Sequence, residues 1–296
     1  MNSISQNALL SDTALRSLLL EYRRANWRNI QTPDAQERVV EDLIRDDGSQ
    51  LFAQLAPYVK LTAESRILDV GSGVGNFVVA CRNRGFKAVG IEPDRIGQDT
   101  TLTAIQIARR RIDSSVFANG VGETLPFPDG CFDLVVMSQV IEHVSDQRRV
   151  IREAGRVVRE GGAIYVACPN YLRFYEPHYK IFWLPLLPKF LGRLYLRLRG
   201  RSAALLDQLT YTTNRRLRKL CKSVGREYSV FDLHREDFLR KRKDGSFAAR
   251  PTRLVNRLTR LPWVGGLFLS TILKYGAIRE GGCAMVIIRN ARGSQP

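Results

Sequence analysis

The sequence predicts an α/β fold, with a mostly parallel sheet and helices on both of its faces. From residue 66 onward, short apolar runs of strand length alternate with longer segments of helical periodicity. Strands that alternate with helices form right-handed βαβ units. The first buried run also leads directly into the glycine turn "GSGVG" at residues 71–75. In open α/β sheets ligands bind where strands end, so this turn is expected to hold a ligand.

Residues 1–62 are predicted to be a helical extension that precedes the sheet. The stretch "PDAQERVVEDLIRDD" places Val39, Val40, Leu43 and Ile44 on one face at helical spacing. The first residues lack a basic run leading into an apolar core with a cleavage site, and no stretch of 18 uncharged apolar residues occurs. We therefore expect neither a signal peptide nor a membrane-spanning helix.

The predicted core covers residues 63–170. Its strands are expected at "RILDV", "KAVGIE", "SSVFAN", "CFDLVVM" and "AIYVAC". Helices are expected over 75–84, 96–111 and 146–160, the last ended by Gly161-Gly162. The remainder of the sheet is predicted within 213–296: a helix over 213–224, strands at "EYSVFDL" and "CAMVIIR", and a basic helical insertion over 234–278.

Composition excludes several classes of protein. With 44% hydrophobic and 25% charged residues, the 296-residue chain is neither disordered nor fibrous. Its five cysteines are widely spread and form no C-x-x-C pair. This argues against a zinc site and against a secreted disulfide framework. We expect a cytoplasmic protein without a metal, its cysteines serving as small core residues.

The net charge of +17 predicts an anionic partner. Residues 171–260 carry 22 Lys and Arg against 7 Asp and Glu, so most of the excess lies in the C-terminal part and not at the glycine turn. Nucleic acid, an acidic lipid surface or a phosphorylated substrate would each fit such a charge.

Two acidic residues narrow the choice of ligand for the glycine turn. A dinucleotide turn reads G-x-G-x-x-G, whereas Gly75 arrives one residue early here. Asp69 directly precedes the turn, where it would repel a pyrophosphate but pair with the ammonium of S-adenosylmethionine. Glu92 ends the next strand, where a carboxylate accepts hydrogen bonds from ribose hydroxyls. Because Glu92 suits both NAD and S-adenosylmethionine, it does not separate a dehydrogenase from a methyltransferase.

The stretch "GETLPFPDGCFDLVVMSQVIEHVSD", residues 122–146, carries a family resemblance. Its "E-x-L-P-F", "F-D-x-V" and "E-H-V" runs resemble those of class I S-adenosylmethionine-dependent methyltransferases over about residues 60–170. The resemblance implies a Rossmann-like sheet of seven strands, the last antiparallel, that binds S-adenosylmethionine. By position it implies a cofactor site of Asp69, Gly71, Ser72 and Gly73 at the methionine end, Glu92 at the ribose, Glu123 at the adenine, and Ser138 and Gln139 at the pocket floor.

One position departs from that pattern. Many members of the family carry an acidic residue two positions before the glutamate, near the adenine amino group, and here that position is Val121. Adenine recognition would then depend on backbone groups or on Asn119.

The segment "PNYLRFYEPHYK", residues 169–180, is the predicted acceptor side. Tyr171, Tyr175 and Tyr179 are candidate substrate contacts, and His178 or Glu176 could remove a proton from an acceptor hydroxyl. The alternative is a polar loop with aromatic packing. His143 in "VIEHV" is a third catalytic candidate, or a structural histidine bound to nearby backbone, while Glu142 is expected to be a solvated residue at a helix start.

Residues 171–212 are predicted to form an amphipathic basic lid. Within "IFWLPLLPKFLGRLYLRLRGR", residues 181–201, apolar positions that include Trp183 and Phe190 alternate with cationic ones. A second such stretch spans 253–276. Both have the composition of interfacial helices, which suggests peripheral contact with the inner membrane face, and a lid with a solvated basic edge is the alternative.

The function predicted is S-adenosylmethionine-dependent methylation of an oxygen on a small-molecule, lipid-linked or saccharide acceptor. Oxygen or carbon acceptors are favoured because no Asn-Pro-Pro-Tyr or Asp-Pro-Pro-Tyr run is present. An RNA methyltransferase ranks lower, since the basic segments are Leu-rich and broken by proline, without a nucleic-acid-binding module. A non-catalytic subunit that binds S-adenosylmethionine remains a further alternative.

Overall fold

The computed structural model describes residues 12–26, 33–46, 48–93, 103–225, 227–233, 235–236 and 283–290. The chain divides into two compact units. Unit 1 consists of Met1–Met137 with Arg152–Ile164, and unit 2 of Ser138–Ile151 with Tyr165–Pro296. Almost all of the basic insertion predicted over 234–278, including the stretch 253–276, lies outside the described residues.

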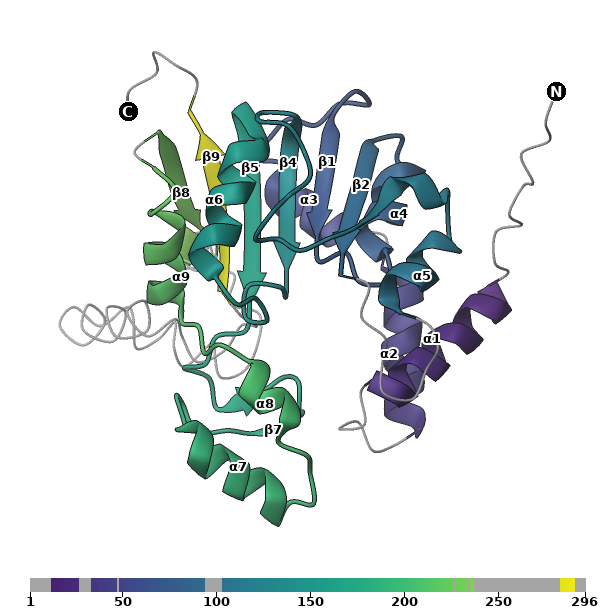
Figure 1. Cartoon of the computed structure of the whole chain (residues 1–296), viewed down its shortest axis with the longest axis vertical. Coiled ribbons are helices and arrows are strands. Elements are labelled where there is room, and N and C mark those ends of the chain that lie inside the picture. The colour runs from purple at the N-terminus through teal and green to yellow at the C-terminus, as the bar shows by residue number, and fades with distance from the viewer. Residues whose placement is uncertain are drawn as a thin grey trace, which may run out of the picture. The chain divides into compact units, whose positions relative to one another are not determined.

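A seven-stranded sheet is the central element of the fold, with strand order β3-β2-β1-β4-β5-β9-β8 (Figure 1). Strand β1 pairs in parallel with β2 and β4, and β2 pairs in parallel with β3. The last strand, β9, runs antiparallel to β8. The sheet is therefore mostly parallel, as predicted. The strand bounds are Arg66–Val70 for β1, Lys87–Glu92 for β2, Phe117–Asn119 for β3, Phe132–Ser138 for β4, Val158–Cys168 for β5, Tyr228–Asp232 for β8 and Cys283–Arg289 for β9.

The helices of unit 1 begin with the predicted N-terminal extension: α1 Asp12–Asn26, α2 Pro33–Arg45 and α3 Ser49–Leu55. Helix α4, Asn76–Asn83, follows β1, and helix α5, Ala104–Arg109, precedes β3. Leu15 and Leu19 of α1 pack with Val40 of α2 and Ile107 of α5 in one buried cluster. This packing attaches the N-terminal helices to the α5 layer of the same unit.

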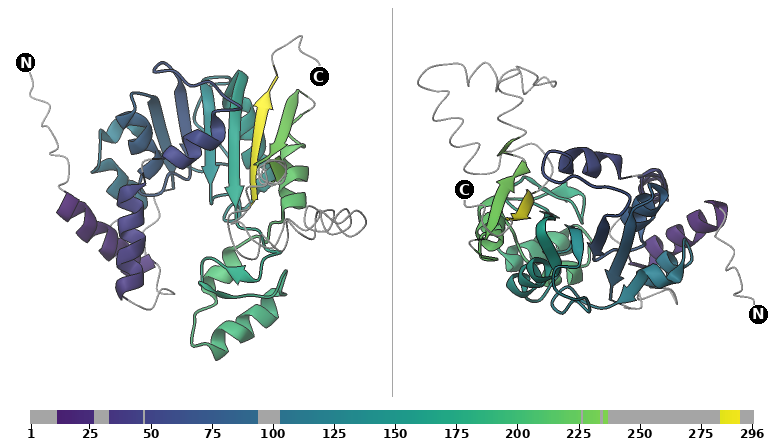
Figure 2. Two further views of the ribbon diagram at one scale, coloured as in Figure 1. Left: turned by 180° about the vertical axis from the view of Figure 1, so that it is seen from behind. Right: turned by 90° about the horizontal axis from the view of Figure 1, so that it is seen from above.

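Unit 2 contains a small subdomain after β5. Its elements are the hairpin of β6 Tyr175–Glu176 and β7 Ile181–Phe182, helix α7 Lys189–Leu198 and helix α8 Ala204–Gln208 (Figure 2). Trp183, Tyr179, Ile181, Leu196 and Leu206 form its buried core. Helix α9 Asn214–Cys221 then packs against β8 and β9. Helix α6, Gln147–Val157, joins β4 to β5 in the sequence.

Several predicted boundaries differ from the structure, among them the following. The helix expected over 146–160 ends at Val157, and Gly161-Gly162 lies inside β5. A Cβ on Gly162 would lie 2.9 Å from the carbonyl oxygen of Asp133, so this glycine permits close strand packing and does not end a helix. The predicted strand "SSVFAN" begins as a 3-10 turn, Ser114–Val116, because the side chain of Asp113 caps Ser115.

The predicted amphipathic segment 181–201 is helical only over α7. Pro185 and Pro188 precede the helix and are incompatible with its interior. Trp183 is buried, so it belongs to the subdomain core and not to an exposed apolar side. The exposed apolar residues of α7 are Phe190, Leu191, Leu194 and Leu198.

All five cysteines are free thiols. Cys81, Cys168, Cys221 and Cys283 are buried, as expected of small core residues, and Cys131 is partly exposed.

Candidate active site

The glycine turn after β1 has the backbone conformation that only glycine adopts readily. Gly71, Gly73 and Gly75 have φ of 70°, 52° and 81°. The amides of Gly71 and Ser72 donate to the carbonyl of Ile91 in β2, at 2.8 and 3.1 Å. A Cβ on Gly73 would meet nothing within 4 Å, whereas one on Gly75 would lie 2.7 Å from the ring of Phe117. The turn is therefore packed at Gly75 and open at Gly73, where a ligand can approach the backbone.

Asp69, near the end of β1, is a buried carboxyl group. Burial, and secondly the nearby Glu92, raise the pKa of Asp69 from 3.8 to about 8. The hydroxyl of Ser72 is buried beside the turn with no hydrogen-bond partner. A cationic group that donates hydrogen bonds, such as an α-ammonium, would match both residues.

Glu92, the last residue of β2, fixes the opposite side of the turn. Its Oε2 accepts a hydrogen bond of 3.0 Å from the amide of Gly73. The carboxylate thus joins the end of the second strand to the open part of the glycine turn. Asn119 ends the adjoining strand β3, and Val121 is 40% exposed beyond it. The two acidic residues singled out from the sequence therefore meet at one turn of unit 1.

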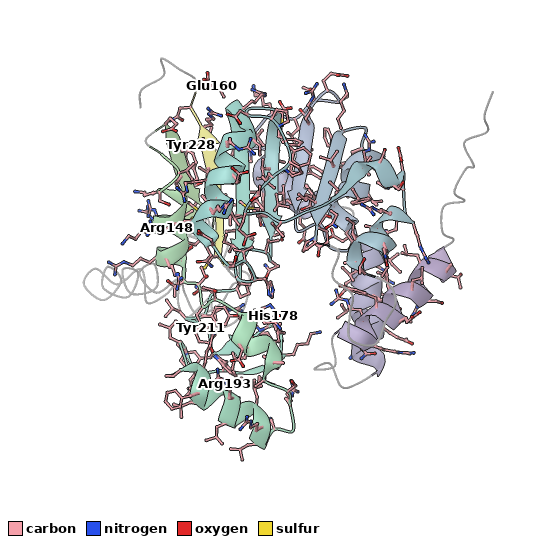
Figure 3. All side chains as sticks on the ribbon, viewed as in Figure 1. Arg148, Glu160, His178, Arg193, Tyr211 and Tyr228 are labelled. Atoms are coloured by element: carbon pink, nitrogen blue, oxygen red, sulfur yellow. The ribbon has the colours of Figure 1, made fainter. Side chains whose placement is uncertain are left out.

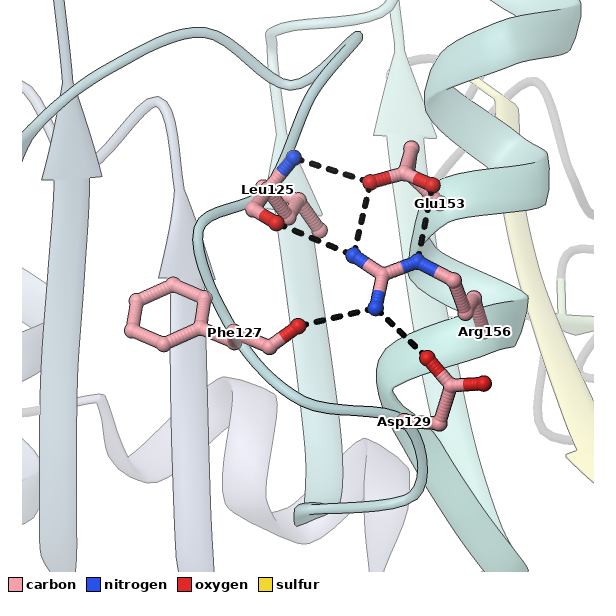
Figure 4. A network of polar contacts seen from close by, with 5 residues as sticks. All are labelled: Leu125, Phe127, Asp129, Glu153 and Arg156. Atoms are coloured by element: carbon pink, nitrogen blue, oxygen red, sulfur yellow. Dashed lines mark hydrogen bonds and ion pairs between the residues drawn. The ribbon is translucent and has the colours of Figure 1, made fainter.

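The "ETLPFPDG" segment is held by a residue that the sequence analysis missed. Arg156 of α6 donates to the carbonyls of Leu125 and Phe127 at 2.9 and 2.8 Å, and to Asp129 at 2.7 Å (Figure 4). It also forms two hydrogen bonds with Glu153, which accepts from the amide of Leu125. The guanidinium therefore anchors the loop that follows Glu123. Val121 and Thr124, on either side of Glu123, form an isolated bridge.

In unit 2, the end of β4 leads into a second cluster. Ser138 and Gln139 are exposed, and Gln139 has φ of 59°, which is uncommon for a residue other than glycine. Its amide donates to the carbonyl of Ala167 at 2.8 Å. Strained backbone of this kind is frequent at functional sites. The structure therefore keeps Ser138 and Gln139 as surface candidates at the end of β4.

Glu142 is buried, which corrects the expectation of a solvated residue at a helix start. It lies in a turn that precedes α6, and its carbonyl accepts from the amide of Thr210 at 2.8 Å. Burial raises the pKa of Glu142 to about 7. The side chain of the adjacent His143 is 38% exposed, and the burial of its ring together with the nearby His178 lowers its pKa to about 4.

Glu176 and His178 form a buried pair in the β6–β7 hairpin. His178 Nδ1 lies 2.7 Å from Glu176 Oε1, and Glu176 Oε2 accepts from the amide of Tyr179 at 2.6 Å. The rings of His178 and His143 meet edge to face, with centroids 5.3 Å apart. The structure thus brings together all three residues predicted as catalytic. A carboxylate that orients an imidazole in this way is suited to proton transfer or to metal binding.

The three predicted substrate tyrosines have different environments. Tyr179 is buried in the subdomain core, where its hydroxyl accepts from the amide of Leu206 at 3.0 Å. Tyr171 is buried and stacks on Tyr211, with centroids 4.3 Å apart, and its hydroxyl has no hydrogen-bond partner. Figure 3 labels His178 and Tyr211, which both belong to unit 2. Tyr175 is 42% exposed. Tyr171 and Tyr179 therefore pack within the fold, while Tyr175 is accessible.

The sheet order, the glycine turn after β1 and the acidic end of β2 agree with the resemblance to class I S-adenosylmethionine-dependent methyltransferases that the sequence carries. Residues 68–166 match the family profile described as "Methyltransferase domain". The chain therefore carries such a domain.

Similarity to known proteins extends over part of the chain. It is 34% identical over 140 residues to the ubiquinone/menaquinone biosynthesis C-methyltransferase UbiE of Xylella fastidiosa (strain M23), covering 45% of this chain and 53% of that protein. It is 30% identical over 105 residues to the uncharacterized methyltransferase YcgJ of Bacillus subtilis (strain 168), covering 34% and 39%. The chain thus spans about half the length, or less, of these relatives.

A solved structure shares the fold. Phosphoethanolamine N-methyltransferase 2 of Haemonchus contortus, in complex with S-adenosyl-L-methionine, superposes with a TM-score of 0.50 at 15% identity, covering 96% of this chain and 61% of that one. None of the described helices has the length and apolar character needed to cross a bilayer.

Proposed function

We propose that this chain transfers the methyl group of S-adenosylmethionine to an oxygen atom of a small-molecule, lipid-linked or saccharide acceptor. The observation that carries the proposal is the buried Asp69 behind an open turn of left-handed glycines. A carboxyl group whose pKa is raised by burial gains most from a cationic ligand, because the cation restores its charged form. A dinucleotide pyrophosphate would instead place negative charge beside Asp69 and Glu92 and would further disfavour the ionised form of Asp69.

The residues of unit 1 would hold the cofactor in distinct ways. Asp69 and the unpartnered hydroxyl of Ser72 would bind the methionine end, with backbone approach at Gly71 and Gly73. Glu92, already bonded to the Gly73 amide, would accept from the ribose hydroxyls. By its order in the sequence, we assign Glu123 to the adenine side. Ser138 and Gln139 belong to unit 2 and are assigned to the pocket floor by sequence order alone. S-adenosylmethionine supplies an electrophilic methyl group on sulfur, and the protein contributes mainly orientation.

Oxygen methylation requires that the acceptor hydroxyl lose a proton. The buried Glu176–His178 pair supports this role, since a carboxylate on Nδ1 leaves Nε2 of the imidazole as the proton acceptor. Tyr175 is the accessible tyrosine among the three proposed to contact the acceptor.

Calorimetry with S-adenosylhomocysteine tests the cofactor assignment. The wild-type chain should bind, whereas Asp69→Ala and Glu92→Ala should each weaken binding at least about 100-fold, as expected when a charged partner is lost. Fluorescence titration with NADH should show no binding. Binding of NADH without binding of S-adenosylhomocysteine would reject the methyltransferase in favour of a dehydrogenase.

Mass spectrometry of cell extracts, with and without the protein, tests the activity and identifies the acceptor. A species heavier by one methyl group is expected. Glu176→Gln and His178→Ala should then lower kcat with unchanged affinity for S-adenosylhomocysteine. Cofactor binding with no methylated product in any extract would favour a non-catalytic subunit.

Carbon methylation is the second candidate, supported by the printed name of one relative, a C-methyltransferase of ubiquinone and menaquinone biosynthesis. Fragmentation of the methylated product distinguishes the two reactions, because an O-methyl group is released by ether cleavage and a C-methyl group is retained. A carbon-bound methyl would replace the oxygen assignment.

Helix α7 supports an acceptor at a membrane surface. Phe190, Leu194 and Leu198 are 66%, 55% and 78% exposed, and α7 also carries Arg193 and Arg197. Arg193, labelled in Figure 3, pairs with Asp207 of α8 at 2.8 Å. Apolar and cationic residues on one helix favour an anionic lipid surface. In a flotation assay, the chain should be recovered with anionic vesicles, and Leu194→Glu should reduce that recovery. Failure of the chain to float, together with salt-sensitive binding to RNA, would favour an RNA substrate.

A further inference from the structure

Glu142 has an unusual environment for a carboxyl group. Its side chain is 0% exposed, and neither Oε1 nor Oε2 has a hydrogen-bond partner. Buried polar groups in proteins are almost always hydrogen-bonded, and an unpaired buried carboxyl group is costly. By contrast Glu176, equally buried, has both oxygens bonded, to His178 and to the amide of Tyr179. Glu142 therefore lacks the kind of partner that the β6–β7 hairpin supplies to Glu176.

Two imidazoles surround that carboxyl group. One ligand atom from each of Glu142, His143 and His178 lies within 4.8 Å of the other two. Nε2 of His143 is 3.9 Å from Oε1 of Glu142. All three residues belong to unit 2, so the cluster is complete within one compact unit.

The backbone around the cluster is fixed. The carbonyl of Glu142 accepts from the amide of Thr210, and the amide of His143 donates to the carbonyl of Val140, both at 2.8 Å. The side chain of Gln147 donates to the carbonyl of Ile141 at 2.7 Å. The cluster is thus held by hydrogen bonds that do not use the ring nitrogens or carboxyl oxygens of the three residues.

Glu176 occupies the position of an outer-shell residue. It binds Nδ1 of His178 at 2.7 Å, which fixes the orientation of the ring and leaves Nε2 as the nitrogen that can bind a ligand. Histidines that bind metal ions usually donate their other ring nitrogen to a carboxylate or a carbonyl in this manner.

We propose that Glu142, His143 and His178 bind a divalent transition-metal ion of the Zn²⁺ type, with Glu176 orienting His178 from the outer shell. Two imidazoles and one carboxylate are a common ligand set for Zn²⁺ with an open fourth position. Metal–ligand distances of about 2.0 to 2.2 Å in tetrahedral geometry place ligand atoms about 3.3 Å apart. The 3.9 Å between Nε2 of His143 and Oε1 of Glu142 would then close by roughly half an ångström. The other pairs of ligand atoms, which lie within 4.8 Å, would close by at most about 1.5 Å through rotations about side-chain bonds.

The ligand types select the class of metal. Mg²⁺ and Ca²⁺ prefer oxygen ligands, whereas imidazole nitrogens favour first-row transition metals. The absence of a C-x-x-C pair in the sequence argued against a zinc site, whereas this cluster contains no cysteine at all. The inference goes beyond methyl transfer, because it concerns metal binding by unit 2. A metal ion on Nε2 of His178 would take the place of the proton that this nitrogen accepts in the proposed reaction, so the two roles belong to different states of the site.

Titration of the chelator-stripped full-length chain with Zn²⁺ tests the proposal. We expect one Zn²⁺ per chain with a dissociation constant in the micromolar range or tighter, and no heat with Mg²⁺. His178→Ala and Glu142→Gln should weaken Zn²⁺ binding at least about 100-fold, and Glu176→Gln about 10-fold to 100-fold, the range typical of outer-shell substitutions.

Matched controls separate this site from adventitious binding and from misfolding. Cys131→Ser removes a partly exposed thiol and should leave Zn²⁺ binding unchanged. Circular dichroism of metal-free Glu142→Gln should match the wild type, because an isosteric amide replaces a carboxyl group with no partner. Zn²⁺ should raise the Tm of the wild type and not that of Glu142→Gln. Absence of Zn²⁺ binding, equal binding by Glu142→Gln and wild type, or loss of binding in Cys131→Ser would overturn the proposal.

Discussion

Replacement of Asp69 by Asn should remove one contribution to the pH dependence of the free energy of unfolding. Burial, and then Glu92, raise the pKa of Asp69 from 3.8 to about 8 in the folded chain. Between these two values the folded chain holds a proton that the unfolded chain releases. The contribution of Asp69 to the free energy of unfolding therefore falls as the pH rises from about 4 to about 8, and is constant above that.

The magnitude follows from the width of this window. Each pH unit within it corresponds to about 1.4 kcal/mol, so the wild type loses about 4 kcal/mol of stability between pH 5 and pH 8 through this one group. Asn does not titrate. The stability of Asp69→Asn relative to wild type should therefore rise by about 4 kcal/mol over that range, on the order of 8 °C in Tm for a chain of this size.

Thermal unfolding of the cofactor-free chain, followed by circular dichroism at pH 5, 6, 7 and 8, measures the effect. Ser72→Ala is the matched control, because it alters the adjacent turn without removing a titrating group, and its Tm should stay parallel to that of wild type. Parallel curves for Asp69→Asn and wild type would refute the buried-carboxyl argument. A gap that widens as the pH falls would refute its sign.

Three further substitutions test the packing around the site by urea unfolding. Arg156→Ala should cost about 3 kcal/mol of stability, because it removes the guanidinium donors of two loop carbonyls and two carboxylates. Full stability of Arg156→Lys would contradict the need for a forked guanidinium. Gly75→Ala should cost at least about 3 kcal/mol of stability, since its Cβ meets the ring of Phe117 at 2.7 Å. The control Gly85→Ala, at a similar φ but in open space, should cost only about 1 to 2 kcal/mol. Equal costs for the two substitutions would contradict the contact with Phe117. Tyr171→Phe should stabilise the chain by about 1 kcal/mol, because its buried hydroxyl has no partner, and a loss of stability would indicate a bond that this hydroxyl makes in solution.

Much of the sheet could be predicted because its signals are local. The strands at Lys87–Glu92 and Cys283–Arg289 have the bounds expected from their apolar runs. The positions of Asp69 and Glu92 at the ends of adjacent parallel strands follow from chain order alone, and the Gly73–Glu92 hydrogen bond agrees with it.

Long-range contacts could not be predicted in this way. Arg156 binds Leu125 across 31 residues, and Glu142 meets His178 across an interval that no helical or strand period connects. The burial of Glu142 depends on the subdomain after β5, so its position next to α6 suggested a solvated residue. The helix expected to reach residue 160 ends earlier because Gly161-Gly162 belongs to a strand that packs closely on Asp133.

The distribution of thiols offers a practical route to observing this molecule. Burial raises the pKa of Cys81 and Cys221, and a hydrogen bond with Cys283 followed by burial raises the pKa of Cys168. These thiols are therefore both inaccessible and weakly nucleophilic at neutral pH. Cys283 is buried as well, which leaves Cys131 as the accessible thiol among the five. A maleimide fluorophore should therefore attach at one defined point of the native chain, ahead of β4, and report ligand binding without prior removal of the other cysteines.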